Sequence, residues 1–258
     1  MSKSGSASAL GAPSSLDQLL RPLHRLVWRD PARRARKLLH FAETEADGGR
    51  DLARAAELTS CPLLRRLFLR HASDEQRHAA LFRRRGQALL STLPRGTWPS
   101  FAAQALSPGE RGLDDLRVDA ERTDSLLAFL HLSERAAAGR FAVYHQVLAD
   151  DAETQAVFAE VLKDEVFHMT YTKTQLQRIA PRQAGRRLYA ARLRRLWRGY
   201  LRLATALAAV LGGAVLLVQY FVLLPPFALL AQRAARREPS GFSPPLVRPP
   251  QRAARAQY

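Results

Sequence analysis

The sequence predicts an all-α protein: a four-helix bundle of two antiparallel hairpins joined by a long crossover, followed by a C-terminal transmembrane helix. Three observations lead to this prediction. Apolar residues recur at helical spacing over four long segments, and no alternating apolar and polar run of convincing length indicates a strand. A run of 22 residues without a charge stands near the C-terminus, and about 20 apolar residues are enough to span a bilayer.

The bundle is expected over residues 30–181. Residues 1–29 begin with a Ser, Gly and Ala-rich stretch without the apolar run of a secretory signal, so we expect a disordered N-terminal segment there. The first helix is predicted over 30–58, because Pro31 suits a first helical position. The second helix is predicted over 62–90, after the capping residues Thr59 and Ser60.

The second hairpin follows a Pro and Gly-rich link at 91–112. Its first helix is predicted over 113–149, with Thr123 as a point where it could break. Its second helix is predicted over 153–179 and ends before Pro181. Short connections within each hairpin and one long link between them are typical of four-helix folds with a single crossover.

The positive charge of the chain is concentrated after the bundle. The formal net charge is +17, which would ordinarily indicate nucleic acid as a partner. Residues 182–258 hold 14 Arg and one acidic residue, a net +13, whereas residues 1–181 hold 26 basic and 22 acidic side chains, a net +4. Because the basic residues flank an apolar run, we expect a membrane surface as the partner and no nucleic acid.

The C-terminal quarter is divided into three parts. Residues 182–202 are expected to form a basic juxtamembrane helix, in which the stretch 186–202 holds seven Arg among Leu, Tyr and Trp. Residues 203–224 form the transmembrane helix, and 225–258 a Pro and Arg-rich tail. More Arg lie before the span than after it, so the positive-inside rule favours a single-pass protein with its N-terminal bundle in the cytoplasm.

Two short motifs share one pattern. DEQRH (74–78) and DEVFH (164–168) each place a histidine three residues after a glutamate. Residues at this spacing share a helix face, so each pair presents a carboxylate and an imidazole to one point. A single pair would be an ordinary surface neighbour, and a metal-free bundle with surface Glu and His is the alternative. Two pairs, each on the second helix of a hairpin, favour a metal site.

The first helices of the hairpins also resemble each other. LHFAETEADGGR (39–50) is similar to LHLSERAAAGR (130–140), and this similarity aligns Glu43 with Glu134. Glu43 precedes Glu75 by 32 residues and Glu134 precedes Glu165 by 31, so both glutamates of a hairpin reach a similar height. Glu45 is a competing ligand, which the sequence alone leaves open.

These residues resemble the ferritin-like di-iron carboxylate superfamily, in particular rubrerythrin and ferritin-type four-helix bundles, over roughly residues 30–180. That family binds metal through a Glu from each of two helices and Glu-x-x-His from the other two. The resemblance implies two iron ions, with manganese as the alternative, bound by Glu43, Glu75, His78, Glu134, Glu165 and His168. Glu75 and Glu165 would bridge the ions, and Asp74 and Asp164 would orient the imidazoles. His40 and His131, each one turn before a ligand, are further candidates for contact with the ligands, and His71 could line the site.

The resemblance implies an oxidoreductase anchored to the membrane that reacts Fe²⁺ with O₂ or peroxide, in iron or oxidative-stress handling. Because Cys61 is the only cysteine, a rubredoxin-type centre is absent and a separate electron donor could be needed. A di-iron hydroxylase of a lipid-soluble substrate, such as a quinone precursor, is one alternative. A non-catalytic metal-binding membrane adaptor is another. A homodimer remains open.

Overall fold

The computed structural model describes residues 13, 15–94 and 118–236. The described residues are helical with turns and contain no strand, which confirms the all-α prediction. Four long helices follow one another: α3 (Pro31–Leu58), α4 (Pro62–Ser91), α5 (Thr123–Val147) and α6 (Ala152–Ile179). The chain divides into two compact units between Arg195 and Leu196.

The N-terminal segment is helical in its described part, so the prediction of disorder over 1–29 is wrong for residues 15–29. Helix α1 (Ser15–Leu19) and helix α2 (Arg21–Arg29) precede the bundle. Trp28, near the end of α2, is 1% exposed, and its ring lies 4.9 Å from that of Tyr144 and 5.6 Å from that of Phe158. This burial fixes α2 against the long helices, because a large aromatic ring contributes several kcal/mol when removed from water.

The ends of the long helices follow local capping. The Asp30 side chain accepts a hydrogen bond from Ala32 N at 3.0 Å, and Pro31 takes the first helical position. The Asp151 side chain accepts from Thr154 N at 2.9 Å at the start of α6. The third predicted helix begins at Thr123 rather than at residue 113. Most of the predicted crossover lies in residues 95–117, outside the described residues.

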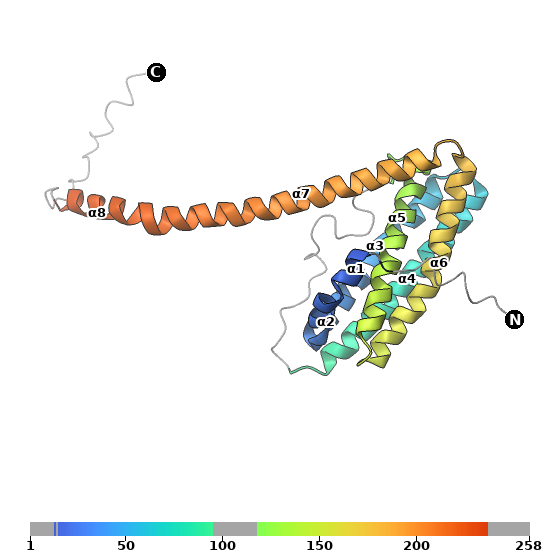
Figure 1. Ribbon diagram of the computed structural model, residues 1–258, viewed down its shortest axis with the longest axis horizontal. Coiled ribbons are helices and arrows are strands. Elements are labelled where there is room, and N and C mark those ends of the chain that lie inside the picture. Colours follow the sequence, from blue (N-terminus) through green and yellow to red (C-terminus); the bar gives the residue numbers. More distant parts are fainter. Residues whose placement is uncertain (1–12, 14, 95–117, 237–258) are drawn as a thin grey trace, which may run out of the picture. The chain divides into compact units, whose positions relative to one another are not determined.

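The four long helices lie side by side (Figure 1). Helix α3 packs on α4, α5 on α6, and α4 on α6, while Phe41 of α3 meets Phe141 of α5 with ring centroids 5.5 Å apart. The buried apolar residues form two clusters. Along α4, Leu64 and Phe68 belong to one cluster and Phe82 and Leu89 to the other, so the middle of the helix lies between two apolar regions.

The C-terminal unit continues the helix α7 (Ala184–Val218) through a π-helical turn, Gln219–Leu223, into α8 (Leu224–Ala235). This stretch is long and apolar enough to be a candidate membrane span, with a mean hydropathy of 2.3 in its best window. The predicted segments 182–202 and 203–224 therefore share one helix, and the predicted tail 225–258 is helical as far as Ala235. Pro225 and Pro226 lack a backbone N–H and clash with carbonyls four residues earlier, which explains the wider turn.

Candidate metal centre

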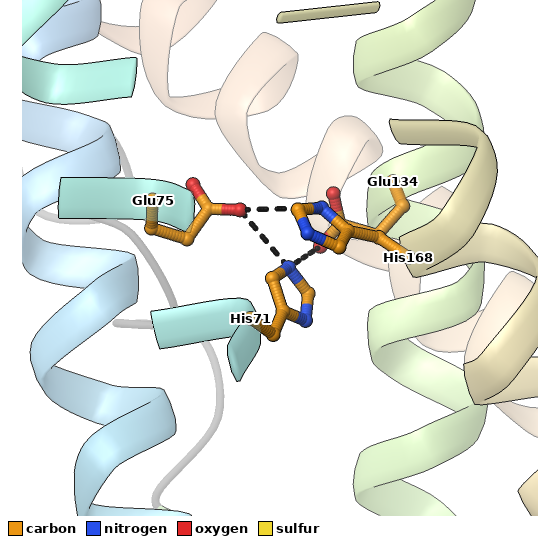
Figure 2. Close-up of side chains that lie close together, drawn as sticks. All are labelled: His71, Glu75, Glu134 and His168. Atoms are coloured by element: carbon orange, nitrogen blue, oxygen red, sulfur yellow. Dashed lines mark hydrogen bonds and ion pairs between the residues drawn. The ribbon is translucent and has the colours of Figure 1, made fainter. Parts of the chain in front are cut away.

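Acidic and histidine side chains from all four long helices converge between the two apolar clusters. The ligand atoms of His71, Glu75, Glu134 and His168 all lie within 4.8 Å of one another, and so do those of Glu45, Glu75 and His78. Glu75 belongs to both groups. Figure 2 shows Glu75 and His71, both from α4, facing His168 of α6 and Glu134 of α5. The described residues thus form a candidate metal centre.

Helical spacing places these side chains. His71, Glu75 and His78 of α4 are four and three residues apart, on one face, and all three are buried. Glu165 and His168 of α6 are also buried and lie three residues apart. The structure thus places Glu75, His78 and His168 in the two ligand groups, whereas Glu165 belongs to neither group and shares a hydrogen bond with Glu134.

A glycine lets α3 approach α4 closely beside the cluster. A Cβ atom at Gly49 would lie 3.1 Å from the backbone oxygen of Ala72 and 3.2 Å from Cβ of Glu75. Those distances are shorter than ordinary carbon contacts. The absence of a side chain at Gly49 therefore sets the separation of the two helices next to Glu75.

Each imidazole of the Glu-x-x-His pairs contacts an aspartate from the opposite helix. His78 Nε2 lies 3.1 Å from Asp164 Oδ2, and His168 Nε2 lies 3.2 Å from Asp74 Oδ2. Arg77 donates to both aspartates, at 2.7 Å to Asp74 and 2.9 Å to Asp164. The sequence predicted contact between these aspartates and the imidazoles, but the exchange of partners between helices is visible only in the structure.

The other ring nitrogen of each imidazole is available to a metal. His78 Nδ1, His168 Nδ1 and Glu165 Oε2 are buried without a hydrogen-bond partner among the described residues. Buried polar atoms are rarely left in this state, because desolvation without a hydrogen bond costs free energy. Divalent cations bound beside them would satisfy such atoms, and neutral imidazole with carboxylate suits iron or manganese. The residues present fit such an ion.

The carboxyl groups of the cluster hold protons more tightly than exposed glutamates do. Burial, with repulsion from neighbouring carboxylates, raises the pKa of Glu75 to about 8. Burial also raises the pKa of Glu134 to about 7 and the pKa values of Glu45 and Glu165 well above the usual range. The Glu45 and Glu75 carboxyls share a hydrogen bond, as do those of Glu134 and Glu165. A bound cation would replace the shared protons.

The histidines of the cluster are neutral. Burial lowers the pKa of His71 to about 3 and that of His168 to about 4, and it also lowers the pKa of His78. The pKa of Asp74 is lowered by its hydrogen bond to His168 and by Arg77, so this aspartate stays ionised. An ionised carboxylate at Nε2 makes the imidazole a better electron donor at Nδ1.

Glu43 lies outside the cluster. Glu45 occupies the ligand position that the repeat alignment assigned to Glu43. Glu43 accepts a hydrogen bond from Arg83 at 2.9 Å, and its side chain is 26% exposed. The two positions differ by 200° around a helix at 3.6 residues per turn. The buried stripe of α3 includes Ala42 and Gly49, and Glu45 continues this stripe. The spacing of small residues is the signal that could have decided between the two.

The other histidines lie in different surroundings. His131 is buried on α5, and its Nδ1 lies 3.0 Å from the backbone oxygen of Met169, next to His168. His40 is half-buried on α3 with its ring near that of Phe41, and neither His40 nor His131 belongs to the two ligand groups. His71, which the sequence gave only as a residue that could line the site, lies at its centre.

No protein-family model, curated protein or solved structure is significantly similar to the chain. The chemistry of the site is therefore inferred from the geometry of its own residues.

Proposed function

We propose that this protein is a ferritin-like di-metal protein that holds two iron ions in its four-helix bundle. Glu45, Glu75 and His78 would hold one ion, and Glu134, Glu165 and His168 the other, with Glu75 and Glu165 shared. Four carboxylates balance the charge of two divalent cations. The observation that carries the proposal is the set of unpartnered buried atoms, His78 Nδ1, His168 Nδ1 and Glu165 Oε2.

We further propose that the protein is an oxidoreductase for Fe²⁺ with O₂ or peroxide. Two ferrous ions held by these carboxylates and imidazoles would supply the two electrons that reduce O₂ to peroxide, or peroxide to water, and would become ferric. The residues of this chain do the rest: Asp74 and Asp164 hold the imidazoles by Nε2, and the apolar clusters on both sides limit access of water. The candidate membrane helix supports action at a membrane surface, with the excess of Arg before the span favouring a cytoplasmic bundle.

Metal content tests the proposal. The full chain, purified in mild detergent and stripped of metal, is loaded anaerobically with Fe²⁺, and bound iron is counted before oxygen or peroxide is added. We expect about two irons per chain and a near-ultraviolet ferric absorption that develops after the oxidant. Fewer than one iron per chain would refute the di-metal assignment. Two irons without oxidation would favour the metal-binding adaptor.

A matched pair of variants tests the ligand set. Glu45→Gln removes a carboxylate that shares a hydrogen bond with Glu75, whereas Glu43→Gln alters a carboxylate two residues away that pairs with Arg83. We expect Glu45→Gln to lower the iron content and Glu43→Gln to leave it unchanged. The opposite result would restore the alignment of Glu43 with Glu134.

A further inference from the structure

The two halves of the centre differ at one position on the second helix of each hairpin. On α4, His71 lies four residues before Glu75 and is fully buried. On α6, the residue four before Glu165 is Val161, which is also fully buried and belongs to an apolar cluster. The imidazole of His71 therefore has no counterpart in the other half.

A second difference accompanies the first. Tyr171, three residues after His168 on α6, is 5% exposed, and its hydroxyl lies 2.7 Å from His71 Nδ1. The matching residue on α4, three after His78, is Leu81, which packs against an apolar cluster. One end of the centre thus carries a hydrogen-bonded His and Tyr pair, and the other end carries Val and Leu.

His71 presents its second nitrogen to the cluster. His71 Nε2 lies 2.9 Å from Glu75 Oε1 and 3.5 Å from Glu134 Oε1, and the ring stacks on that of His168 with centroids 3.6 Å apart. His168 Nδ1 lies 3.6 Å from the same Glu75 oxygen. Both imidazoles and both carboxylates therefore face one point, which Figure 2 shows.

The hydrogen bond to Tyr171 is compatible with a tautomer that suits a metal, because a tyrosine hydroxyl can accept a proton from an imidazole N–H. When Nδ1 of His71 carries the ring proton and donates it to the Tyr171 hydroxyl, the lone pair of Nε2 faces Glu75 and Glu134. A ligating histidine is usually held in this way by a partner at its other nitrogen. The Tyr171 hydroxyl has the geometry of such a partner.

We propose that His71 is a seventh ligand, which binds one of the two metal ions through Nε2, and that Tyr171 is the residue that positions it. This inference rests on the proposed function. It makes the two metal positions unequal: one has two imidazoles, from His71 and His168, and the other has one, from His78. Because imidazole binds late first-row divalent metals more strongly than carboxylate alone does, the first ion enters the position with two imidazoles.

Titration of the metal-free full chain in detergent with Co²⁺, in competition with a chelator, tests this inference. We expect two separate binding steps for the unaltered protein. His71→Phe keeps a ring stacked on His168 and should lower the Co²⁺ affinity of only one step. The loss should exceed the roughly 10–100-fold that removal of a hydrogen-bond partner of a ligand costs, because a ligand itself is removed. Tyr171→Phe removes only the hydroxyl and should weaken the same step by roughly 10-fold. His145→Phe, at a half-buried histidine of α5 that belongs to neither ligand group, should change neither step.

A direct count of bound imidazoles accompanies the titration. A histidine bound to Co²⁺ gives a shifted proton signal from its other ring N–H, which disappears in D₂O; we expect one such signal fewer in His71→Phe. Two binding steps that are unchanged in both His71→Phe and Tyr171→Phe would overturn this inference alone. Absence of a second Co²⁺ in the unaltered protein would overturn the two-ion proposal as well. If His71→Phe does not fold, as judged by circular dichroism, Tyr171→Phe decides.

Discussion

Two neighbouring glycines of α3 offer a test of how closely the helices pack at the centre. Alanine at Gly49 would bring a Cβ atom within 2.5 Å of Gln76 Nε2, 3.1 Å of the Ala72 backbone oxygen and 3.2 Å of Glu75 Cβ. The Gln76 amide can move, but it then loses its 3.0 Å hydrogen bond to the backbone oxygen of Ala46. Ala72 and Glu75 belong to the body of α4, so that helix must shift. At Gly48 the same Cβ atom would meet nothing within 4 Å.

The magnitude follows from these contacts. Overpacking costs about 1–3 kcal/mol, and the lost hydrogen bond costs about 0.5–1.5 kcal/mol. Both alanine variants gain about 1 kcal/mol from higher helix propensity, and this gain cancels when they are compared. Gly49→Ala should therefore be about 1.5–4.5 kcal/mol less stable than Gly48→Ala, which should itself be more stable than the unaltered protein.

Denaturation of the metal-free chain by guanidinium in mild detergent, followed by circular dichroism, measures the difference. Gly49→Ala should also bind Fe²⁺ more weakly, because the shift of α4 displaces Glu75, whereas Gly48→Ala should bind it normally. Equal stability of the two variants would refute the close approach of α3 and α4. Equal Fe²⁺ affinity despite a stability difference would show that Glu75 is not held by this contact.

Three further predictions concern the surroundings of the centre. Arg77→Gln should lower Fe²⁺ affinity roughly 10-fold in a chelator competition, because Asp74 and Asp164 lose the guanidinium that joins them; unchanged affinity would contradict this role. Asp151→Asn should destabilise the bundle by about 1.5–3 kcal/mol at neutral pH, because the guanidinium groups of Arg34 and Arg85 each lose a charged hydrogen-bond partner. Burial alone would raise the pKa of Asp151, but its hydrogen bonds outweigh this effect and lower the pKa to about 2. The stabilisation by Asp151 is therefore present above about pH 4 and is lost as pH falls through about 2. A stability difference between Asp151→Asn and the unaltered protein that does not change with pH would refute this reasoning. Trp28→Ala should cost about 3–5 kcal/mol in the same denaturation assay, and a near-neutral result would show that α2 does not stabilise the bundle.

The part of the centre that depends only on helical spacing could be predicted from the sequence. Glu75 with His78, and Glu165 with His168, lie three residues apart within a single helix, and that spacing fixes a shared face without knowledge of the rest of the fold. The choice between Glu43 and Glu45 depended instead on an alignment of 12 residues with 11. One residue of uncertainty in such an alignment changes the helix face by 100°.

Features that depend on contacts between distant segments could not be predicted. Tyr171 is 100 residues from His71, and no local pattern relates the two. The partners of Asp74 and Asp164 are exchanged between α4 and α6, which requires knowing which helices are neighbours. The helix that ends near Trp28 is defined by its packing on Tyr144 and Phe158 rather than by the polar composition before it.

The position of the centre between two apolar clusters determines how metal binding relates to folding. Each cluster joins side chains from several of the long helices, so hydrophobic contacts hold these helices together on both sides of the ligands. This differs from small zinc domains, which are unfolded without metal. The ligands are therefore held near one another before an ion arrives, and binding need not create helix.

Addition of Fe²⁺ under anaerobic conditions should accordingly leave the far-ultraviolet circular dichroism unchanged and raise the denaturation midpoint. An ion that binds only the folded state stabilises it by about 2.7 kcal/mol when its free concentration is 100 times the dissociation constant. Much of this gain should vanish in Glu165→Gln, because that variant lacks a carboxylate oxygen that is otherwise buried without a partner. A large increase in helix content on metal addition would mean that the apolar clusters do not hold the metal-free bundle together, and the preformed centre described by the structure would then be wrong.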